Sequence, residues 1–261
     1  MAQIHCNFFS YTIGYNVDIM VVLPSISPCD MENGILSHKV THKYPVLYLL
    51  HGHGNDYMCW SRFTSMERYV EERRIAVVTC SVGNKGYMNA DAYGENYYEF
   101  VAKELPEFIL ANFQISDRPE DTYIAGLSMG GYGTLAHGLG HPESYRAIGA
   151  FSPAIIWNSD TVGEKLGHGL PDMMDLYRQV EENKKEHIKF PELFLCIGNK
   201  DFLYEQVTDF HNYLLKKSVT HYYDDISGYE HEWAFWDLEL PKFLDWLPRT
   251  DAYADMPVHK M

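Results

Sequence analysis

A Gly-x-Ser-x-Gly motif between an apolar run and a helix-compatible run constrains this chain more than any other feature. The motif is Gly126-Leu127-Ser128-Met129-Gly130; the run DTYIAGL leads into it and MGGYGTLAHGL follows its serine. A sharp turn from strand to helix holds a serine in a strained backbone conformation, and small neighbours leave room for it. The helix start then directs backbone N–H groups at the reacting oxygen. This setting predicts a nucleophile elbow, with Ser128 as a catalytic nucleophile.

Short apolar runs alternate with longer amphipathic ones, which is typical of a mainly parallel sheet covered by helices. YPVLYLL and RIAVVTCSV are almost continuously apolar, as expected for strands buried on both faces. With the elbow, this pattern predicts the α/β-hydrolase fold: a mainly parallel central sheet of about eight strands, flanked by helices. Strands are expected at 3–10, 16–23, 45–50, 75–81, 122–127, 147–152, 192–198 and 220–226. Helices are expected near 61–73, 95–113, 129–139, 172–187, 203–217 and 232–246.

The length of 261 residues suits one α/β domain spanning 1–261. The polar, proline-containing stretch 24–43 predicts a surface loop. Residues 153–171 are rich in glycine and predict a small lid or insertion above the sheet. Pro106 lies inside an expected helix and should kink it or mark the start of a second one.

Charge and composition narrow the function classes. The formal net charge of −15 argues against a nucleic-acid partner, which needs a basic surface. The five cysteines are scattered without a CxxC pair, and the first residues do not resemble a signal peptide, so a cytoplasmic protein is expected. No apolar run approaches membrane-spanning length, so no membrane partner is expected, and a homo-oligomer remains open.

A serine hydroxyl needs a base, and the base needs an orienting acid. In this fold the chain order is serine, acid, histidine, with the acid after a late strand and the histidine after the last one. ELFLCIGNKD ends an expected strand with Asp201, and HYYDDISGYEHEW places His231 in the loop after the final strand. The order therefore predicts Ser128, Asp201 and His231 as a catalytic triad.

Other candidates fit this order less well. Asp224 and Asp225 lie within the last expected strand, and Glu205 lies where a helix should begin. His211 and His221 fall on an expected helix and at a strand start, where surface histidines are common. His137 and His141 flank the C-terminal end of the helix after the elbow, where capping or solvated histidines are expected.

The segment His51-Gly52-His53-Gly54 follows the strand YPVLYLL. An HG-type turn at this place supplies a backbone N–H to an oxyanion, so the N–H groups of His53 and Met129 are the expected oxyanion hole. Two histidines two positions apart also suggest a metal site. No third ligand cluster lies nearby in the sequence, so neither a metal nor another cofactor is expected.

Several stretches together resemble the esterase D-like family, and most closely its tributyrin-esterase branch. They are YPVLYLLHGHGND, SMERYVEERRIAVVTCSVGN, AYGENYYEFVAKELP, YIAGLSMGGYG, GNKDFLYE and GYEHEWAFWD, in this order over most of the chain. The resemblance implies a serine esterase of short acyl chains, with Ser128, Asp201 and His231 as its triad. Relatives cleave acetyl and feruloyl groups from plant polysaccharides, and more distant ones are S-formylglutathione hydrolases and mycolyltransferases.

The leading hypothesis is a carboxylesterase that cleaves small-molecule or saccharide esters of short acyl chains through an acyl-enzyme on Ser128. The alternatives are a feruloyl or acetyl-xylan type of esterase, an acyltransferase on the same scaffold, and a non-catalytic binding module. The intact set of five site residues argues against the last of these. Candidate walls of the substrate pocket are Trp60, Tyr87, Trp157 and Trp233.

Overall fold

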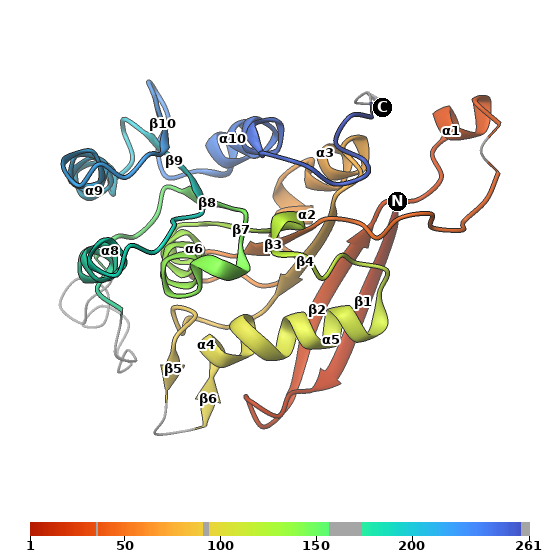
Figure 1. The fold of residues 1–261 in the computed structure, drawn as a ribbon, viewed down its shortest axis with the longest axis horizontal. Coiled ribbons are helices and arrows are strands. Elements are labelled where there is room, and N and C mark those ends of the chain that lie inside the picture. Colours follow the sequence, from red (N-terminus) through yellow and green to blue (C-terminus); the bar gives the residue numbers. More distant parts are fainter. Residues whose placement is uncertain (35, 91–93, 157–173, 257–261) are drawn as a thin grey trace.

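The structure is a computed structural model that describes residues 1–34, 36–90, 94–156 and 174–256. Its central feature is an eight-stranded sheet with the order β1-β2-β4-β3-β7-β8-β9-β10 (Figure 1). Strands β1, β2 and β4 pair antiparallel, and the pairs from β4 to β10 are parallel. The strands are β1 (Ala2–Phe9), β2 (Asn16–Leu23), β3 (Val46–Leu50), β4 (Ala76–Cys80), β7 (Thr122–Leu127), β8 (Ala147–Phe151), β9 (Glu192–Gly198) and β10 (Tyr222–Ile226).

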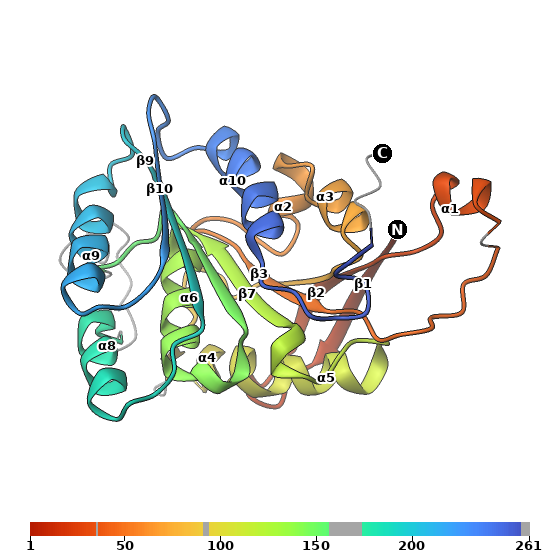
Figure 2. The ribbon, with the colours of Figure 1, turned by 45° about the horizontal axis from the view of Figure 1, so that its top comes forward.

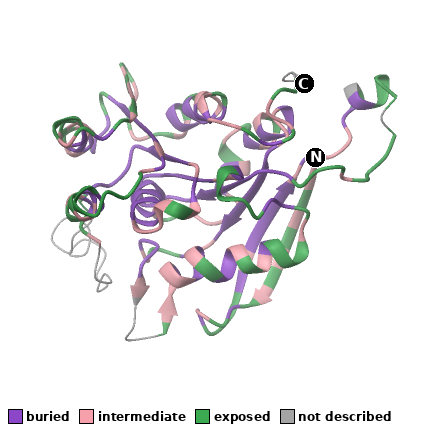
Figure 3. Cartoon of the chain, viewed as in Figure 1, coloured by how far each residue is buried: buried purple, intermediate pink, exposed green. Residues whose placement is uncertain are grey.

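Helices cover both faces of the sheet. One face of the sheet packs against α5, α6, α8 and α9, and the other face packs against α2, α3 and α10 (Figures 1 and 2). The core therefore has two apolar layers, one on each side of the sheet. Buried residues are concentrated in the central strands and on the inner sides of the helices (Figure 3). The helices are α1 (Pro28–Glu32), α2 (Cys59–Phe63), α3 (Met66–Glu72), α4 (Tyr97–Glu99), α5 (Leu105–Asn112), α6 (Met129–Gly140), α8 (Leu176–Lys185), α9 (Tyr204–Lys216) and α10 (Trp233–Trp246). None of the described helices is long and apolar enough to cross a membrane.

The expected helix at 95–113 is in fact three consecutive pieces. After α4, a π-helical turn covers Phe100–Glu104, and α5 then begins at Leu105 with Pro106 in its first turn. The run is helical throughout, since Glu104 and Leu105 have α-type backbone angles and the Leu105 N–H donates to the Phe100 carbonyl. Pro106 lies directly after the π-helical turn, where the α-helical pattern restarts inside this continuous run, and a restart was one of the two expected outcomes. Next to this region, the short strands β5 (Asn89–Ala90) and β6 (Glu95–Asn96) form a hairpin that the sequence patterns did not predict.

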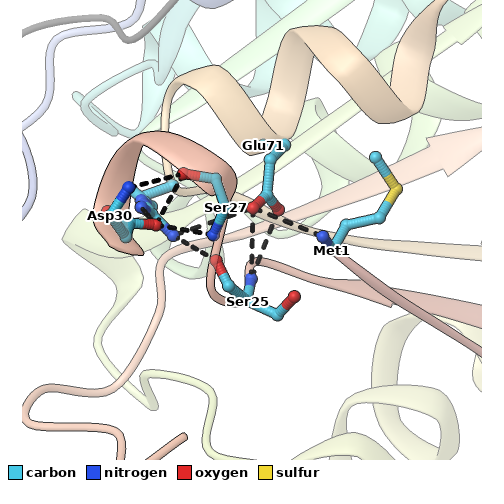
Figure 4. A network of polar contacts seen from close by, with 6 residues as sticks. Met1, Ser25, Ser27, Asp30 and Glu71 are labelled. Carbon is cyan, nitrogen blue, oxygen red and sulfur yellow. Dashed lines mark hydrogen bonds and ion pairs between the residues drawn. The ribbon is translucent and has the colours of Figure 1, made fainter. Parts of the chain in front are cut away.

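The stretch 24–43 contains a short helix, α1, where only a loop was expected. Ser27 and Asp30 form reciprocal hydrogen bonds at its start: the Ser27 N–H donates to Asp30 Oδ2 at 2.8 Å, and the Asp30 N–H donates to Ser27 Oγ at 3.2 Å. Figure 4 shows this pair beside Glu71, whose carboxylate accepts from the Ser25 N–H and lies 3.3 Å from the Met1 amino group. These contacts fix the start of the stretch against α3.

A partly buried ionic cluster joins α10 to β10, and Glu239 is its buried member. The Lys242 ammonium donates to Asp224 Oδ2 at 2.9 Å and to Glu239 Oε1 at 2.6 Å. The other Glu239 oxygen, Oε2, is buried and has no hydrogen-bond partner among the described residues. Burial raises the pKa of Glu239 to about 7, although Lys242 beside it acts in the opposite direction. The cluster lies on the two elements that flank the His231 loop.

The raised pKa of Glu239 predicts a contribution to stability that weakens as the pH rises. An unfolded glutamate has a pKa of about 4.3, so the folded state binds this proton more tightly. The contribution is fully present below pH ~4.3 and is lost as the pH rises through about 7. Compared with Glu239→Gln, the natural protein should lose about 2 kcal/mol of unfolding free energy between pH 5 and pH 8.

Urea denaturation of both proteins at several pH values measures this difference. The matched control is Glu186→Gln, which changes an exposed carboxylate at the end of α8 and should follow the natural protein at every pH. Parallel stability curves for Glu239→Gln and the natural protein would contradict the prediction.

Candidate active site

Ser128 lies at the turn between β7 and α6, and its backbone has φ 54° and ψ −115°. This is a strained conformation for a residue with a side chain. The neighbouring glycines allow close packing around it. A Cβ on Gly126 would lie 2.5 Å from the Gly130 carbonyl oxygen, and a Cβ on Gly130 would lie 2.6 Å from the Leu50 carbonyl oxygen. The predicted strand–turn–helix geometry is therefore present.

Backbone hydrogen bonds hold the elbow in place. The Ser128 N–H donates to the Phe151 carbonyl at 2.9 Å, and the Ser128 carbonyl accepts from the N–H groups of Tyr132 and Ala154 at 3.0 and 3.1 Å. The turn is thus tied to the end of β8, to its own helix and to the segment after β8. The strained conformation is maintained by surrounding structure, as a preorganised nucleophile requires.

Gly130→Ala should destabilise the fold by about 3 kcal/mol, because the added methyl would meet the backbone carbonyls of Leu50 and His51 at 2.6 and 2.7 Å. The matched control is Gly138→Ala on the same helix, where the methyl meets the side-chain carbons of Ile148. A rotating side chain yields more easily than backbone, so the loss there should be clearly smaller. Urea denaturation midpoints compare the two variants, and equal losses would contradict this account of the elbow.

The structure brings Asp201 and His231 together. His231 Nδ1 lies 2.8 Å from Asp201 Oδ2, and the other oxygen, Oδ1, accepts from the Leu203 N–H at 2.9 Å. Asp201 is buried just after β9, and His231 is partly exposed in the loop between β10 and α10. Since Nδ1 faces the carboxylate, Nε2 is the nitrogen that can exchange a proton with a reacting group.

Two aromatic rings flank the His231 ring. Phe202 lies with its centroid 4.6 Å away, and Trp236 lies 5.0 Å away at 85°. The Trp236 indole N–H donates to Ser152 Oγ at 3.2 Å. Ser152 directly follows Phe151, whose carbonyl accepts from the Ser128 N–H. Through these contacts His231 lies at the same edge of the sheet as the elbow.

The rival candidates have other partners. Asp224 belongs to the Lys242 cluster, and Asp225 accepts from the Tyr204 hydroxyl at 2.6 Å. His211 and His221 face each other with their ring nitrogens 2.8 Å apart, between α9 and β10. His137 is fully buried on α6, where burial lowers its pKa to about 3. His141 is the C-cap residue of that helix.

The loop after β3 is held by side chains from behind. The His51 Nε2 accepts from the Val82 N–H at 3.1 Å, so its proton is on Nδ1, which donates to the Gly52 carbonyl at 2.7 Å. Burial lowers the pKa of His51, which favours this neutral form. The Tyr87 hydroxyl donates to the His51 carbonyl, and the Trp60 indole N–H donates to the Leu50 carbonyl.

This loop also lies close to the first turn of α6, since a Cβ on Gly130 would be 2.7 Å from the His51 carbonyl oxygen. The loop residue His53 and the helix residue Met129 are therefore carried by two segments that lie close together. The Gly54 N–H donates to Asn84 Oδ1 at 2.7 Å and fixes the far side of the loop. This arrangement suits an oxyanion hole made by the backbone N–H groups of His53 and Met129.

The four candidate pocket walls lie in different environments. Trp60 and Tyr87 are fully buried, so in this conformation they support the loop from behind. Trp233 is partly exposed and packs against Phe63, with their ring centroids 4.9 Å apart. Trp157 lies outside the described residues, as does the lid prediction beyond residue 156.

Sequence reasoning missed the two rings around His231. Phe202 directly follows the predicted acid, and Trp236 lies five positions after the predicted base. Their closeness to those residues was a usable signal, but neither the pattern nor the chain order shows which aromatic side chains face the imidazole. Among the described residues no group of three or more histidine, cysteine or carboxylate side chains could hold a metal ion.

Two solved structures from Staphylococcus aureus share this fold. The fluorophosphonate-binding serine hydrolase FphF has a TM-score of 0.81 and 27% sequence identity, over 95% of this chain and 99% of that chain. The S-formylglutathione hydrolase FrmB has a TM-score of 0.80 and 29% identity, over 94% and 96%. With the sheet described above, these similarities define the class: the protein is a serine hydrolase with the α/β-hydrolase fold, as predicted.

The family follows from the sequence comparison. A family model described as "Putative esterase" matches residues 10–247, and the chain belongs to this family. One relative, an acetyl esterase of Caldicellulosiruptor saccharolyticus, is 27% identical over 268 residues, covering 96% of this chain and 99% of the relative. The resemblance to esterase D-like enzymes is thereby confirmed, and the placement in the tributyrin-esterase branch stays a prediction.

Proposed function

We propose that this protein hydrolyses carboxylic esters of short acyl groups through an acyl-enzyme on Ser128. The observation that carries the proposal is the 2.8 Å contact between His231 Nδ1 and Asp201 Oδ2, at the sheet edge where Ser128 sits on its strained turn. A nucleophile, a base and an orienting acid in this order are the parts that serine-based acyl transfer requires.

In the first half of the reaction, Ser128 Oγ attacks the ester carbonyl carbon while His231 Nε2 takes the hydroxyl proton. The carbonyl oxygen becomes an oxyanion, and the N–H groups of His53 and Met129 donate to it. Asp201 stabilises the imidazolium and fixes its orientation. His231 then gives the proton to the alcohol oxygen, the carbon–oxygen bond breaks, and the alcohol leaves.

In the second half, a water molecule replaces the alcohol. His231 takes a proton from this water as it attacks the acyl carbon, and the oxyanion forms at the same place. The proton returns to Ser128 Oγ when the acyl–serine bond breaks, so the acid is released and the enzyme is restored. The chain's own residues supply each of these proton transfers.

The names of two relatives support a small acyl group. One is an acetyl esterase and another an S-formylglutathione hydrolase, and acetyl and formyl are the two smallest acyl groups. Each buried methylene contributes about 0.8 kcal/mol, so selectivity rises with chain length only until the pocket is full. A pocket that fits acetyl groups should therefore favour the shortest acyl chains.

The specificity constant kcat/KM across p-nitrophenyl esters from C2 to C16 tests the acyl preference. We expect a maximum between C2 and C4 and a steep fall beyond it. Methyl ferulate and S-formylglutathione belong in the same panel, because they separate the alternative esterases. A maximum at C10 or longer would contradict the proposal.

A further inference from the structure

Phe202 is an exposed aromatic side chain in an unusual place. It is 76% exposed, although it lies between Asp201 and Leu203, which are both buried. Its ring is tilted by 54° against the His231 ring, with their centroids 4.6 Å apart. The proposed general base therefore lies beside a large apolar group that is itself open to solvent.

The backbone that carries Phe202 is held on both sides. The Asp201 N–H donates to the Gly198 carbonyl, and the Asp201 carbonyl accepts from the Tyr204 N–H, both at 3.0 Å. The Leu203 N–H donates to the Asp201 carboxylate at 2.9 Å. An aromatic ring on such a fixed turn loses little conformational freedom when another group packs on it.

The chemistry of ester cleavage decides which part of a substrate can meet this ring. Nε2 of His231 must reach the alcohol oxygen to protonate it, so the substituent on that oxygen lies beside the imidazole. Of the two rings that flank the imidazole, Trp236 is buried and its N–H is held by Ser152. The open ring is that of Phe202, so it is the one that a leaving alcohol can contact.

We infer that Phe202 sets the preference for the alcohol part of the ester. It favours alcohols that carry a ring with a flat apolar face, which is a sugar ring or an aryl ring. Such a face can stack on the exposed phenyl group, whereas a short alkyl group covers little of it. The inference rests on the proposed function, since it names the leaving group of the same reaction.

Three acetate esters of primary alcohols test the inference: ethyl acetate, benzyl acetate and a methyl glucoside acetylated at its primary hydroxyl. They share the acyl group and release alcohols of similar chemistry, so differences report the alcohol contacts. In Phe202→Ala, kcat/KM for at least one ring-bearing ester should fall about tenfold more than for ethyl acetate. Phe202→Tyr should restore the preference. The control Leu215→Ala removes an exposed apolar side chain from α9, away from His231 in the sequence, and should leave the preference unchanged.

The outcomes separate the two hypotheses. A selective loss with benzyl acetate alone identifies an aryl ring, and a loss with the acetylated glucoside alone identifies a sugar ring. Equal losses for all three esters would mean that Phe202 only supports His231, and unchanged ratios would mean that it touches no substrate; either result overturns the inference. If the natural protein hydrolyses neither these esters nor p-nitrophenyl acetate, the proposed function fails and the inference falls with it. If it hydrolyses p-nitrophenyl acetate but none of the three, the inference alone is overturned.

Discussion

Ser128→Ala should lower kcat for ester hydrolysis by about a million-fold while the protein stays folded. The hydroxyl is the group that forms the acyl bond, and no other part of the proposed machinery can replace it. Alanine carries only the Cβ atom that Ser128 already accommodates at φ 54°, so the elbow should keep its conformation. Steady-state hydrolysis of p-nitrophenyl acetate measures the loss.

The matched control is Ser37→Ala, which removes an exposed hydroxyl from the stretch before β3. It should keep full activity. Circular dichroism and urea midpoints of both variants should match the natural protein. Turnover by purified Ser128→Ala within tenfold of the natural rate would refute a serine nucleophile at this position.

Asp201→Asn should lower kcat by about ten-thousand-fold, which is the second largest effect that we expect. The Leu203 N–H donates to Asp201 Oδ1, so an asparagine would keep its amide oxygen there and turn its NH₂ group toward His231. The imidazole Nδ1 would then have to accept, and its proton would move to Nε2. An Nε2 that carries the proton cannot take one from Ser128.

Asp225→Asn is the control for this change, because Asp225 was one of the rival acids and its carboxylate accepts from the Tyr204 hydroxyl. It should retain activity within a few-fold. Comparable losses in the two asparagine variants would show that the acid had been assigned wrongly. A folded Asp201→Asn protein with nearly normal kcat would contradict the role of the Asp201–His231 pair.

Much of the fold could be predicted because its strands carry strong local signals. The buried parallel strands are short, almost continuously apolar runs, so β3, β4 and β7 begin and end within one residue of their expected bounds. The elbow was predictable because a strand-to-helix turn at a serine needs glycine neighbours. The Asp201–His231 pair followed from chain order, since parallel strands bring their carboxyl ends to one edge of the sheet.

Other features depend on contacts that no local pattern contains. The expected helix 61–73 divides into α2 and α3, and the Ser65 N–H between them donates to Asp237 on α10 at 2.9 Å. At the end of the π-helical turn, the Glu104 carboxylate accepts from the Ser10 hydroxyl at 2.6 Å and from the Tyr11 N–H at 2.8 Å. Trp60 and Tyr87 were candidate pocket walls for which a core position was also open, and their polar atoms donate to the carbonyls of Leu50 and His51. An aromatic residue has the same sequence signature in a core and in a pocket wall.

Covalent labelling by a fluorophosphonate tests the central claim most directly, because the reagent reacts with an activated serine whatever the natural substrate is. Intact mass should show one adduct per chain, and peptide mapping should place it on Ser128. Ser128→Ala should remain unlabelled, and Asp201→Asn should react far more slowly. An adduct on another residue, or an active enzyme that stays unlabelled, would contradict the account.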